Sequence, residues 1–425
     1  MKRKLKIAVT ALALCSCFAL GACGGGGGDT NGNEVSITYW NLNTGADGAT
    51  MKSLVERFNE EYKGKIYVTP QSANEEIYYS NLESNIPIGR GPDVAILHSY
   101  RVQSYANQGL IIPADELIES AQIDMNDFPA QIVESLKFEN KSYAVPFDMH
   151  PLGIYYNKAL LASYGCEIPT NREELIAAAK KADNEDGKVW GLPISTRWPS
   201  AYTYTTALYQ FGGVEITAGD QPGFNTQAGK DALASVASLI HTEKVSPESL
   251  GNDQDLALFR AGKALFHIQG SWMLSSLKKS SIDFGIIPLS RMFNSQSDEI
   301  AVRSHTFVFP KQRKENAQKR EASIEFVKWM VENSGSWAEA GQIPASQKAR
   351  DGEKYKALPY VQDFGDIANF RIGVSSPYYF EAYTPVYSCI TDALQKPDYD
   401  VDALFSAAEI EGQKLVKEIK ELLGK

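Results

Sequence analysis

The chain has 425 residues, of which 43% are hydrophobic and 22% are charged, values close to those of globular proteins. This length is enough for two or three domains, and the composition excludes a chain that is disordered throughout. The formal net charge of −10 argues against a nucleic-acid or anionic-membrane surface, because such surfaces need basic patches.

Residues 1–22 have the pattern of an export signal. The segment Lys2–Lys6 is basic, and the apolar stretch Ile7–Leu20 is too short for a typical membrane-spanning helix. The following Leu20-Gly21-Ala22-Cys23 resembles the lipobox of bacterial lipoproteins, which makes Cys23 the expected lipidation site. An ordinary cleaved signal with an incidental cysteine is the alternative. Residues 23–34 are rich in glycine and are expected to form a flexible tether.

Beyond the tether, strand patterns alternate with helix patterns. Residues Val35–Trp40 alternate with period two, as a strand does, and Met51, Leu54, Val55 and Phe58 follow the spacing of a helix with one apolar face. Further strands are predicted at Ile66–Val68, Asp93–Leu97, Tyr143–Phe147, Leu152–Tyr156, Ala264–Ile268, Phe284–Ile287 and Thr306–Phe309, and helices at Glu321–Glu332 and Asp402–Leu423. This alternation favours an α/β class with mostly parallel sheets.

The motifs of common hydrolases, metalloproteases and nucleotide-binding proteins are absent from the sequence. The five histidines, His98, His150, His241, His267 and His305, have no metal-ligand spacing, so neither a metal nor another cofactor is expected. Carboxylates are numerous enough to supply a glycosidase pair by chance, but nothing in the sequence selects one. Because the mature protein is expected to be exported, Cys166 and Cys389 could form a disulfide, although two separate buried thiols are favoured.

The aromatic residues, 21 Tyr, 18 Phe and 6 Trp, are the feature of the composition that indicates a function. Flat rings match the apolar C–H face of a sugar, and planar Asp, Asn and Arg groups match its hydroxyls. Trp40, Trp198 and Trp272 lie at predicted strand ends and loops, where α/β sheets bind ligands. Trp329 and Trp337 lie in or beside a helix, which favours core packing.

Short motifs in a fixed order resemble one protein family. They are Ile37-Thr38-Tyr39-Trp40-Asn41, Gly91-Pro92-Asp93-Val94, Tyr143–Asp148, Phe259–Ala264, Gly270-Ser271-Trp272 and Gly341-Gln342-Ile343-Pro344. Each motif is weak alone. The ordered set, which runs from Val35 nearly to the C-terminus, resembles the extracellular solute-binding proteins of ATP-binding-cassette sugar importers, the class that includes maltose-binding protein.

The resemblance implies a two-lobed, periplasmic-binding-protein-like α/β fold of type II, with a cleft between lobes joined by hinge crossings. The first lobe is expected to hold residues 35–147 and 304–345, and the second 148–303 and 346–425. The implied protein is a monomer and not an enzyme. It is held by its lipid anchor on the extracellular face of the bacterial cytoplasmic membrane, and it delivers a carbohydrate, expected to be an oligosaccharide, to permease subunits. Ligand binding is expected to favour the closed lobes.

The resemblance also implies the ligand-binding residues. They are Trp40, Asn41, Asn43, Ser99, Tyr100, Arg101, Asp148, His150, Trp198, Tyr202, Trp272 and His305. Trp272 matches the family's Gly-x-Trp stacking aromatic. Asp148 and His150 match the first crossing and His305 the second, where Arg-Ser-His replaces a small, often glycine-rich element. A core role for the tryptophans and a purely structural role for Asp148 are the alternatives.

Two other functions stay open at this point. A receptor of the same fold could bind a non-sugar solute such as a polyamine, a metal chelate or a peptide, since aromatic boxes and carboxylates also bind cations. A surface enzyme that acts on glycans would need a carboxylate pair with suitable separation in the cleft.

Overall fold

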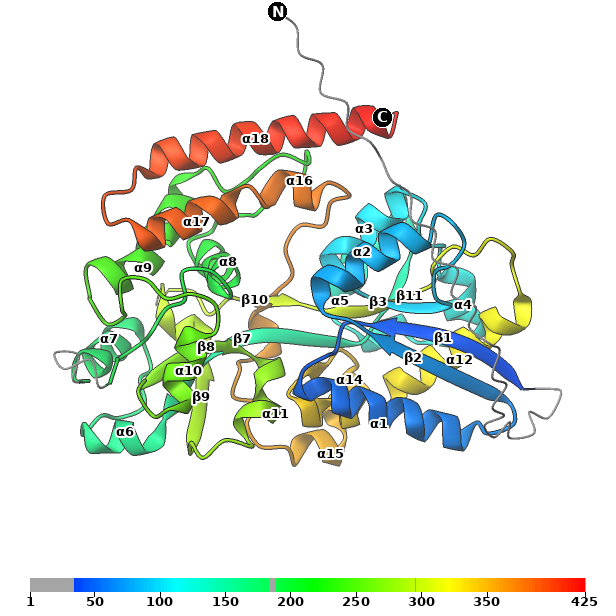
Figure 1. The fold of residues 1–425 in the computed structure, drawn as a ribbon, viewed down its shortest axis with the longest axis horizontal. Coiled ribbons are helices and arrows are strands. Elements are labelled where there is room, and N and C mark those ends of the chain that lie inside the picture. The colour runs from blue at the N-terminus through cyan, green and yellow to red at the C-terminus, as the bar shows by residue number, and fades with distance from the viewer. Residues whose placement is uncertain (1–33, 183–188, 295, 425) are drawn as a thin grey trace, which may run out of the picture.

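A computed structural model describes residues 34–182, 189–294 and 296–424, which form two α/β lobes side by side (Figure 1). The predicted export signal, Cys23 and the glycine-rich tether lie outside the described residues. Within the described ranges, no helix combines the length and the apolar character needed to cross a membrane.

The first lobe is built on a five-stranded sheet with the order β2-β1-β3-β11-β6. Its strands are β1 (Val35–Asn41), β2 (Ile66–Ser72), β3 (Val94–His98), β6 (Ala144–Pro146) and β11 (His305–Val308). The first three are parallel, whereas β11 runs antiparallel to β3 and β6. The helices and the small hairpin of this part are α1 (Ala46–Glu61), α2 (Glu75–Asn85), α3 (Ser99–Asn107), α4 (Asp115–Ser120), α5 (Ala130–Ser135), β4 (Lys137–Phe138), β5 (Lys141–Ser142), α12 (Ala317–Glu332) and α13 (Ser334–Trp337).

The second lobe is built around β7 (Asp148–Asn157), all ten residues of which are buried. This strand pairs antiparallel with β8 (Phe266–Gly270), β9 (Phe284–Pro288), β10 (Ile300–Arg303) and the short β12 (Ile343–Pro344), and β10 pairs with β13 (Phe370–Arg371). The helices are α6 (Lys158–Ser163), α7 (Arg172–Lys180), α8 (Ser200–Gln210), α9 (Gln227–His241), α10 (Gln254–Arg260), α11 (Leu274–Leu277), α16 (Tyr379–Tyr383), α17 (Val386–Gln395) and α18 (Val401–Leu422).

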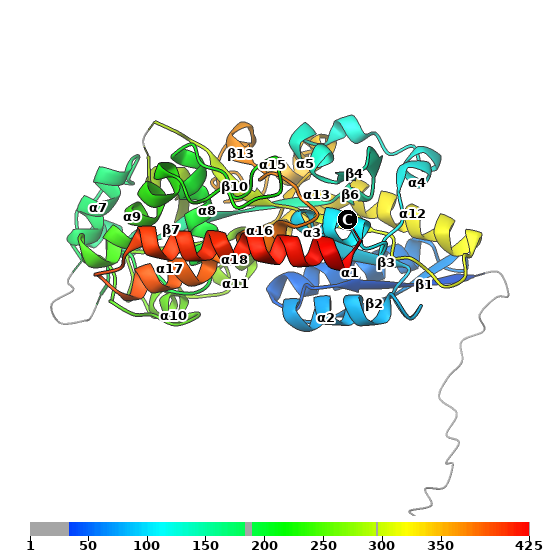
Figure 2. The same ribbon diagram turned by 90° about the horizontal axis from the view of Figure 1, so that it is seen from above.

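Two adjacent chain crossings connect the sheets. Phe147 separates β6 from β7, and Ser304 separates β10 from β11. Two short helices, α14 (Gln347–Asp351) and α15 (Glu353–Lys356), follow β12 and contact α13. They therefore lie against the first lobe, whereas the family resemblance implies that residues from 346 onward belong to the second. Viewed from above, α18 lies over α17 and reaches toward the first lobe (Figure 2).

Most of the predicted elements are present. The four apolar residues that predict the first helix, Met51, Leu54, Val55 and Phe58, are the buried residues of α1. The predicted strands correspond to β1, β2, β3, β6, β7, β8, β9 and β11, with ends shifted by up to four residues. Cys166 and Cys389 are both free, so the expectation of two separate thiols is confirmed, although Cys166 is only partly buried.

Candidate functional site

A cavity of about 670 Å³ lies between the lobes and is lined by both. This volume is typical of small-molecule sites. The first lobe contributes Leu42, Asn43, Thr44, Gly45, Ala46, Asp47, Asn74, Glu75, His98 and Tyr100. The second contributes His150, Arg197, Trp198, Ala201, Tyr202, Thr205, Trp272, Met273, Ser276, Tyr387, Ile390 and Thr391, and Arg303, His305 and Gln342 lie at or near the crossings.

The second lobe supplies an aromatic wall. The rings of Trp198 and Trp272 stack with centroids 6.1 Å apart and planes at 30°. Tyr202 lies beside Trp198 and donates a hydrogen bond to the His150 carbonyl oxygen at 2.7 Å. The Trp272 ring lies directly against Gly270, where a Cβ atom would meet the ring at 2.2 Å. The glycine of the Gly-Ser-Trp motif therefore leaves room for the tryptophan ring.

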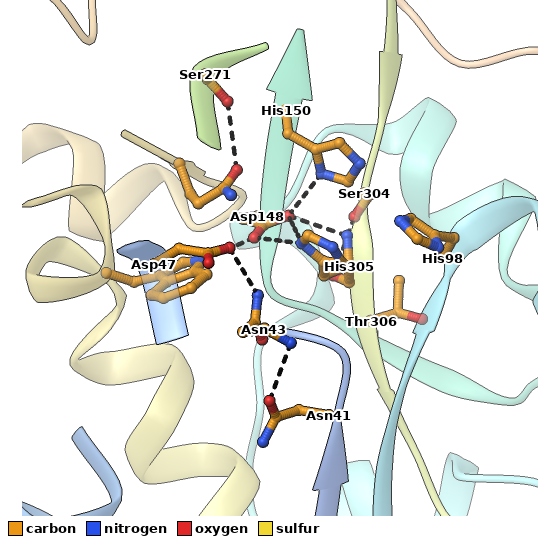
Figure 3. A network of polar contacts seen from close by, with 12 residues as sticks. Asn41, Asn43, Asp47, His98, Asp148, His150, Ser271, Ser304, His305 and Thr306 are labelled. Carbon is orange, nitrogen blue, oxygen red and sulfur yellow. Dashed lines mark hydrogen bonds and ion pairs between the residues drawn. The ribbon is translucent and has the colours of Figure 1, made fainter. Parts of the chain in front are cut away.

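The first lobe supplies a polar wall. Asn41 ends β1, and its side-chain oxygen accepts a hydrogen bond from the backbone N–H of Asn43 at 3.1 Å. The Asn43 side chain in turn donates to Asp47, in the first turn of α1, at 3.1 Å (Figure 3). Glu75, in the first turn of α2, is the other carboxylate among the residues that line the cavity. The turns that follow β1 and β2 thus present amide and carboxylate groups to the aromatic wall.

Buried Asp148 lies beneath the cavity floor, at the first crossing. Its carboxylate accepts hydrogen bonds from the Trp337 indole at 2.6 Å and the His305 backbone N–H at 2.9 Å, and it contacts Nδ1 of His305 at 2.8 Å and of His150 at 3.2 Å (Figure 3). Burial raises the pKa of Asp148, but the charge of His305 and the hydrogen bonds from both rings outweigh it and hold this pKa well below its usual range. Asp148 therefore joins both crossings to α13.

The three histidines of the floor differ in charge. Burial lowers the pKa of His98 well below its ordinary value and that of His150 to about 4. Burial also acts to lower the pKa of His305, but the adjacent Asp148 carboxylate outweighs this effect and raises it. At neutral pH His98 and His150 are therefore uncharged, whereas Asp148 favours the protonated form of His305.

Arg303 closes one side of the cavity. It donates to Glu215 at 2.8 Å and to the Tyr379 hydroxyl at 2.6 Å, and its guanidinium lies 4.8 Å from the Tyr100 ring centroid. Because Glu215 is fully buried and paired with it, the charge of Arg303 is already balanced within the protein.

Of the twelve predicted binding residues, seven line the cavity and five do not. Asn43, Tyr100, His150, Trp198, Tyr202, Trp272 and His305 line the cavity. Trp40, Asn41, Ser99, Arg101 and Asp148 do not. Trp40 packs against a core cluster, Ser99 is buried, and Asn41 and Asp148 orient residues that do line the cavity. Arg101 lies over the rings of Tyr79 and Phe380, at 3.6 Å and 4.1 Å from their centroids.

Several residues that line the cavity are not among those predicted from the sequence. Asp47 and Glu75 begin helices directly after β1 and β2, so their place at the carboxyl ends of parallel strands could have indicated them. Thr205 lies within helix α8, and nothing local distinguishes it from a packing residue.

A family described as bacterial extracellular solute-binding protein matches residues 43–336, which is more than half of the chain. The chain belongs to this family. Among curated relatives, the maltotriose-binding protein of Pyrococcus abyssi is 24% identical over 331 residues, covering 76% of this chain and 70% of the relative. The galactooligosaccharide-binding protein of Bacillus subtilis is 22% identical over 324 residues, covering 72% and 73%.

Solved structures give the same fold for this solute-binding protein. The substrate-binding protein Lmo0181 of Listeria monocytogenes, in complex with cycloalternan, superposes with a TM-score of 0.78 at 20% identity, over 91% of this chain and 100% of that chain. The MalE domain of Bdellovibrio bacteriovorus, bound to maltotriose, gives a TM-score of 0.77 at 23% identity, over 90% and 100%. The predicted two-lobed type II fold is therefore confirmed.

Proposed function

We propose that this solute-binding protein captures an oligosaccharide in the interlobe cavity and delivers it to the permease of an ATP-binding-cassette importer. The observation that carries the proposal is the stacked pair Trp198 and Trp272, which faces the amide and carboxylate groups of Asn43 and Asp47 across one cavity. Relatives named for maltotriose and galactooligosaccharide binding support the same ligand class.

The physical basis is complementarity to a sugar ring. A pyranose has an apolar face that packs on flat indole rings and a rim of hydroxyls that bonds to carboxylates and amides. The two indoles together offer more apolar surface than one ring, which suits a ligand of more than one sugar unit. Contacts from both lobes favour the closed arrangement once the ligand is bound.

The test is calorimetric titration of the purified full-length chain with maltotriose, galactooligosaccharides and monosaccharides. Saturable binding of one equivalent, with the sugar recovered unaltered, is expected. Trp198→Ala is expected to weaken this binding at least 10-fold. Tyr67→Ala is the matched control, because Tyr67 on β2 is 46% exposed, much like Trp198 at 48%, but lies outside the cavity. Release of shorter sugars, or equal affinity of the two variants, would refute the proposal.

A second candidate ligand is an organic cation such as a polyamine. Asp47 and Glu75 line a cavity rich in aromatic rings, and that combination also binds ammonium groups. The fold alone does not distinguish a sugar ligand from an organic cation. UgpB of Mycobacterium tuberculosis, solved in complex with glycerophosphocholine, superposes with a TM-score of 0.77 at 17% identity. Asp47→Asn separates the two, because it should abolish binding of spermidine but only weaken that of a neutral oligosaccharide.

The proposed anchor is a lipid on Cys23, which would hold a monomeric receptor at the extracellular face of the cytoplasmic membrane beside its permease. The lipobox pattern and the membership in an extracellular family support it. In a bacterial host, the chain should partition into detergent and incorporate radiolabelled palmitate. Cys23→Ala should release it into the aqueous phase, and retention of both properties in that variant would refute the anchor.

A further inference from the structure

We propose that His98, His150 and His305 bind a divalent transition-metal ion of the zinc class at the floor of the cavity. One ring nitrogen from each lies within 4.8 Å of the other two, and these residues are the only such group of three among the described ranges of the chain. All three rings line the cavity that the solute is proposed to enter, so an ion bound there would be accessible from it.

Strand pairing brings the three histidines together across more than 200 residues of sequence. His305 lies directly opposite His98 in the β3–β11 ladder, and His150 lies opposite Arg303 in the β7–β10 ladder. The ring centroids of His150 and His305 are 4.3 Å apart and those of His98 and His305 are 4.9 Å apart. Because all three positions belong to paired strands beside the crossings, the cluster is fixed by backbone structure.

The Nδ1 atom of each ring contacts a polar group of the protein, which fixes the orientation of the ring. Nδ1 of His98 lies 2.7 Å from the Tyr79 hydroxyl, and those of His150 and His305 contact the Asp148 carboxylate (Figure 3). The Nε2 atoms have no hydrogen-bond partner among the described residues. Metal-ligating histidines typically bond one nitrogen to a carboxylate or other polar group and coordinate with the other.

The spacing is close to that of a zinc site. A tetrahedral ion with metal–nitrogen bonds of about 2.0 Å holds its ligand nitrogens roughly 3.3 Å apart. The three nitrogens lie within 4.8 Å of one another, so rotation of the side chains would have to bring them closer to reach this spacing. Three histidine ligands leave a fourth coordination position, which would face the cavity and could hold water or an oxygen atom of a solute.

The charges around the cluster favour a cation. Asp148 is fully buried behind two of the rings, and a bound ion would take the place of the proton with which His305 balances this carboxylate. Asp47 and Glu75 line the same cavity. The nearby Arg303 is paired with Glu215 at 2.8 Å, so its charge is largely cancelled. Imidazole nitrogens with a carboxylate behind them suit zinc, cobalt, nickel or copper and not magnesium or calcium.

The test is titration of the full-length chain, purified without a histidine tag and stripped with EDTA, with Zn²⁺. Binding of one equivalent is expected by calorimetry and by elemental analysis after dialysis. His98→Gln and His150→Gln are each expected to lower zinc affinity at least 10-fold. His241→Gln is the matched control, because His241 on α9 lies outside the cavity and bonds to the Ala393 carbonyl. Unchanged zinc affinity in both cluster variants would overturn the site.

A second measurement keeps the test decisive if a cluster variant fails to fold. Co²⁺ added to the unmodified chain should give the visible absorption of a four- or five-coordinate site, and an octahedral spectrum or none would overturn the proposal. The proposed sugar binding can be tested independently of the proposed metal site. Trp272→Ala should lose sugar binding and keep zinc, because Trp272 lies beside the cluster but is not one of its ligands.

Discussion

The indole nitrogen of Trp337 lies 2.6 Å from a carboxylate oxygen of Asp148, and both side chains are fully buried. The bond joins α13 to the first residue of β7, and the same carboxylate accepts from the backbone of His305 at the second crossing. The buried Asp148 carboxylate thus joins the two crossings at Phe147 and Ser304 to α13 of the first lobe.

Trp337→Phe keeps an aromatic ring but removes the donor to Asp148. We expect the free energy of unfolding to fall by about 2 kcal/mol, because a hydrogen bond to a buried charge is among the stronger ones. Urea denaturation measures the change. Trp329→Phe is the matched control, since its indole donates over the same 2.6 Å to Glu61, whose side chain is half exposed. Equal losses in the two variants would contradict the assigned role of Asp148.

Asp148→Asn should cost more than Trp337→Phe. The amide cannot accept the bonds of His305, His150 and Trp337 together, and it leaves their donors buried without a charged partner. We expect a loss of about 3 kcal/mol or more in unfolding free energy. Asp283→Asn breaks an exposed pair with Lys158 at 2.9 Å and should cost less than about 1 kcal/mol. Similar costs at the two positions would contradict this prediction.

Gly270→Ala tests whether the cavity needs the tryptophan ring where it lies. The backbone at Gly270 is extended, so alanine introduces no backbone strain, but its Cβ would meet the Trp272 ring at 2.2 Å. We expect the ring to move and solute affinity to fall at least 10-fold. Gly219→Ala, with its nearest neighbour at 3.8 Å, should leave affinity unchanged. Titration of both variants with the same sugar gives the result, and an unaltered Gly270→Ala affinity would contradict it.

Asp255→Asn should change stability in a pH-dependent way. Burial raises the pKa of Asp255 to about 6, and burial lowers the pKa of neighbouring His267 to about 3, so the ring stays neutral and cannot offset the carboxylate charge. Because the folded-state pKa lies above the unfolded value, stability is lost as pH rises from about 4 to 6. Asparagine has no such charge.

The variant should therefore be more stable than the parent by about 3 kcal/mol at pH 7.5 and nearly indistinguishable from it at pH 4. Denaturation at the two pH values measures the difference. A gain of equal size at both would show that the charge of Asp255 is not its origin, and the exposed Asp283→Asn should show no gain at either.

The sequence indicates local structure well and the composition of the site only partly. Helix α1 is predicted from four spaced apolar residues, because its burial repeats with the helical period. Trp40 is predicted as a ligand contact because it closes the first strand. In the structure, alternation along β1 buries Tyr39 and Asn41 in one direction and turns Trp40 against a core cluster in the other.

The histidine cluster shows the other limit. Metal-binding motifs are recognised in a sequence by ligands that lie close together along the chain. His98, His150 and His305 are far apart in sequence and come together only through the pairing of β3, β11, β7 and β10. No local pattern encodes that register. The same holds for Arg101, which follows a contact loop in sequence but lies between the Tyr79 and Phe380 rings.

The stacked indoles and the carboxylates of the cavity belong to different lobes, and this division would order the events of the proposed capture. Trp198 and Trp272 come from the second lobe, whereas Asp47 and Glu75 come from the first. Because both indoles belong to one lobe, their stacking does not depend on how the two lobes are arranged, so the proposed solute could make its first contacts there. On the proposed function, the polar contacts of the first lobe would then lengthen the residence time of the solute and leave its rate of arrival unchanged.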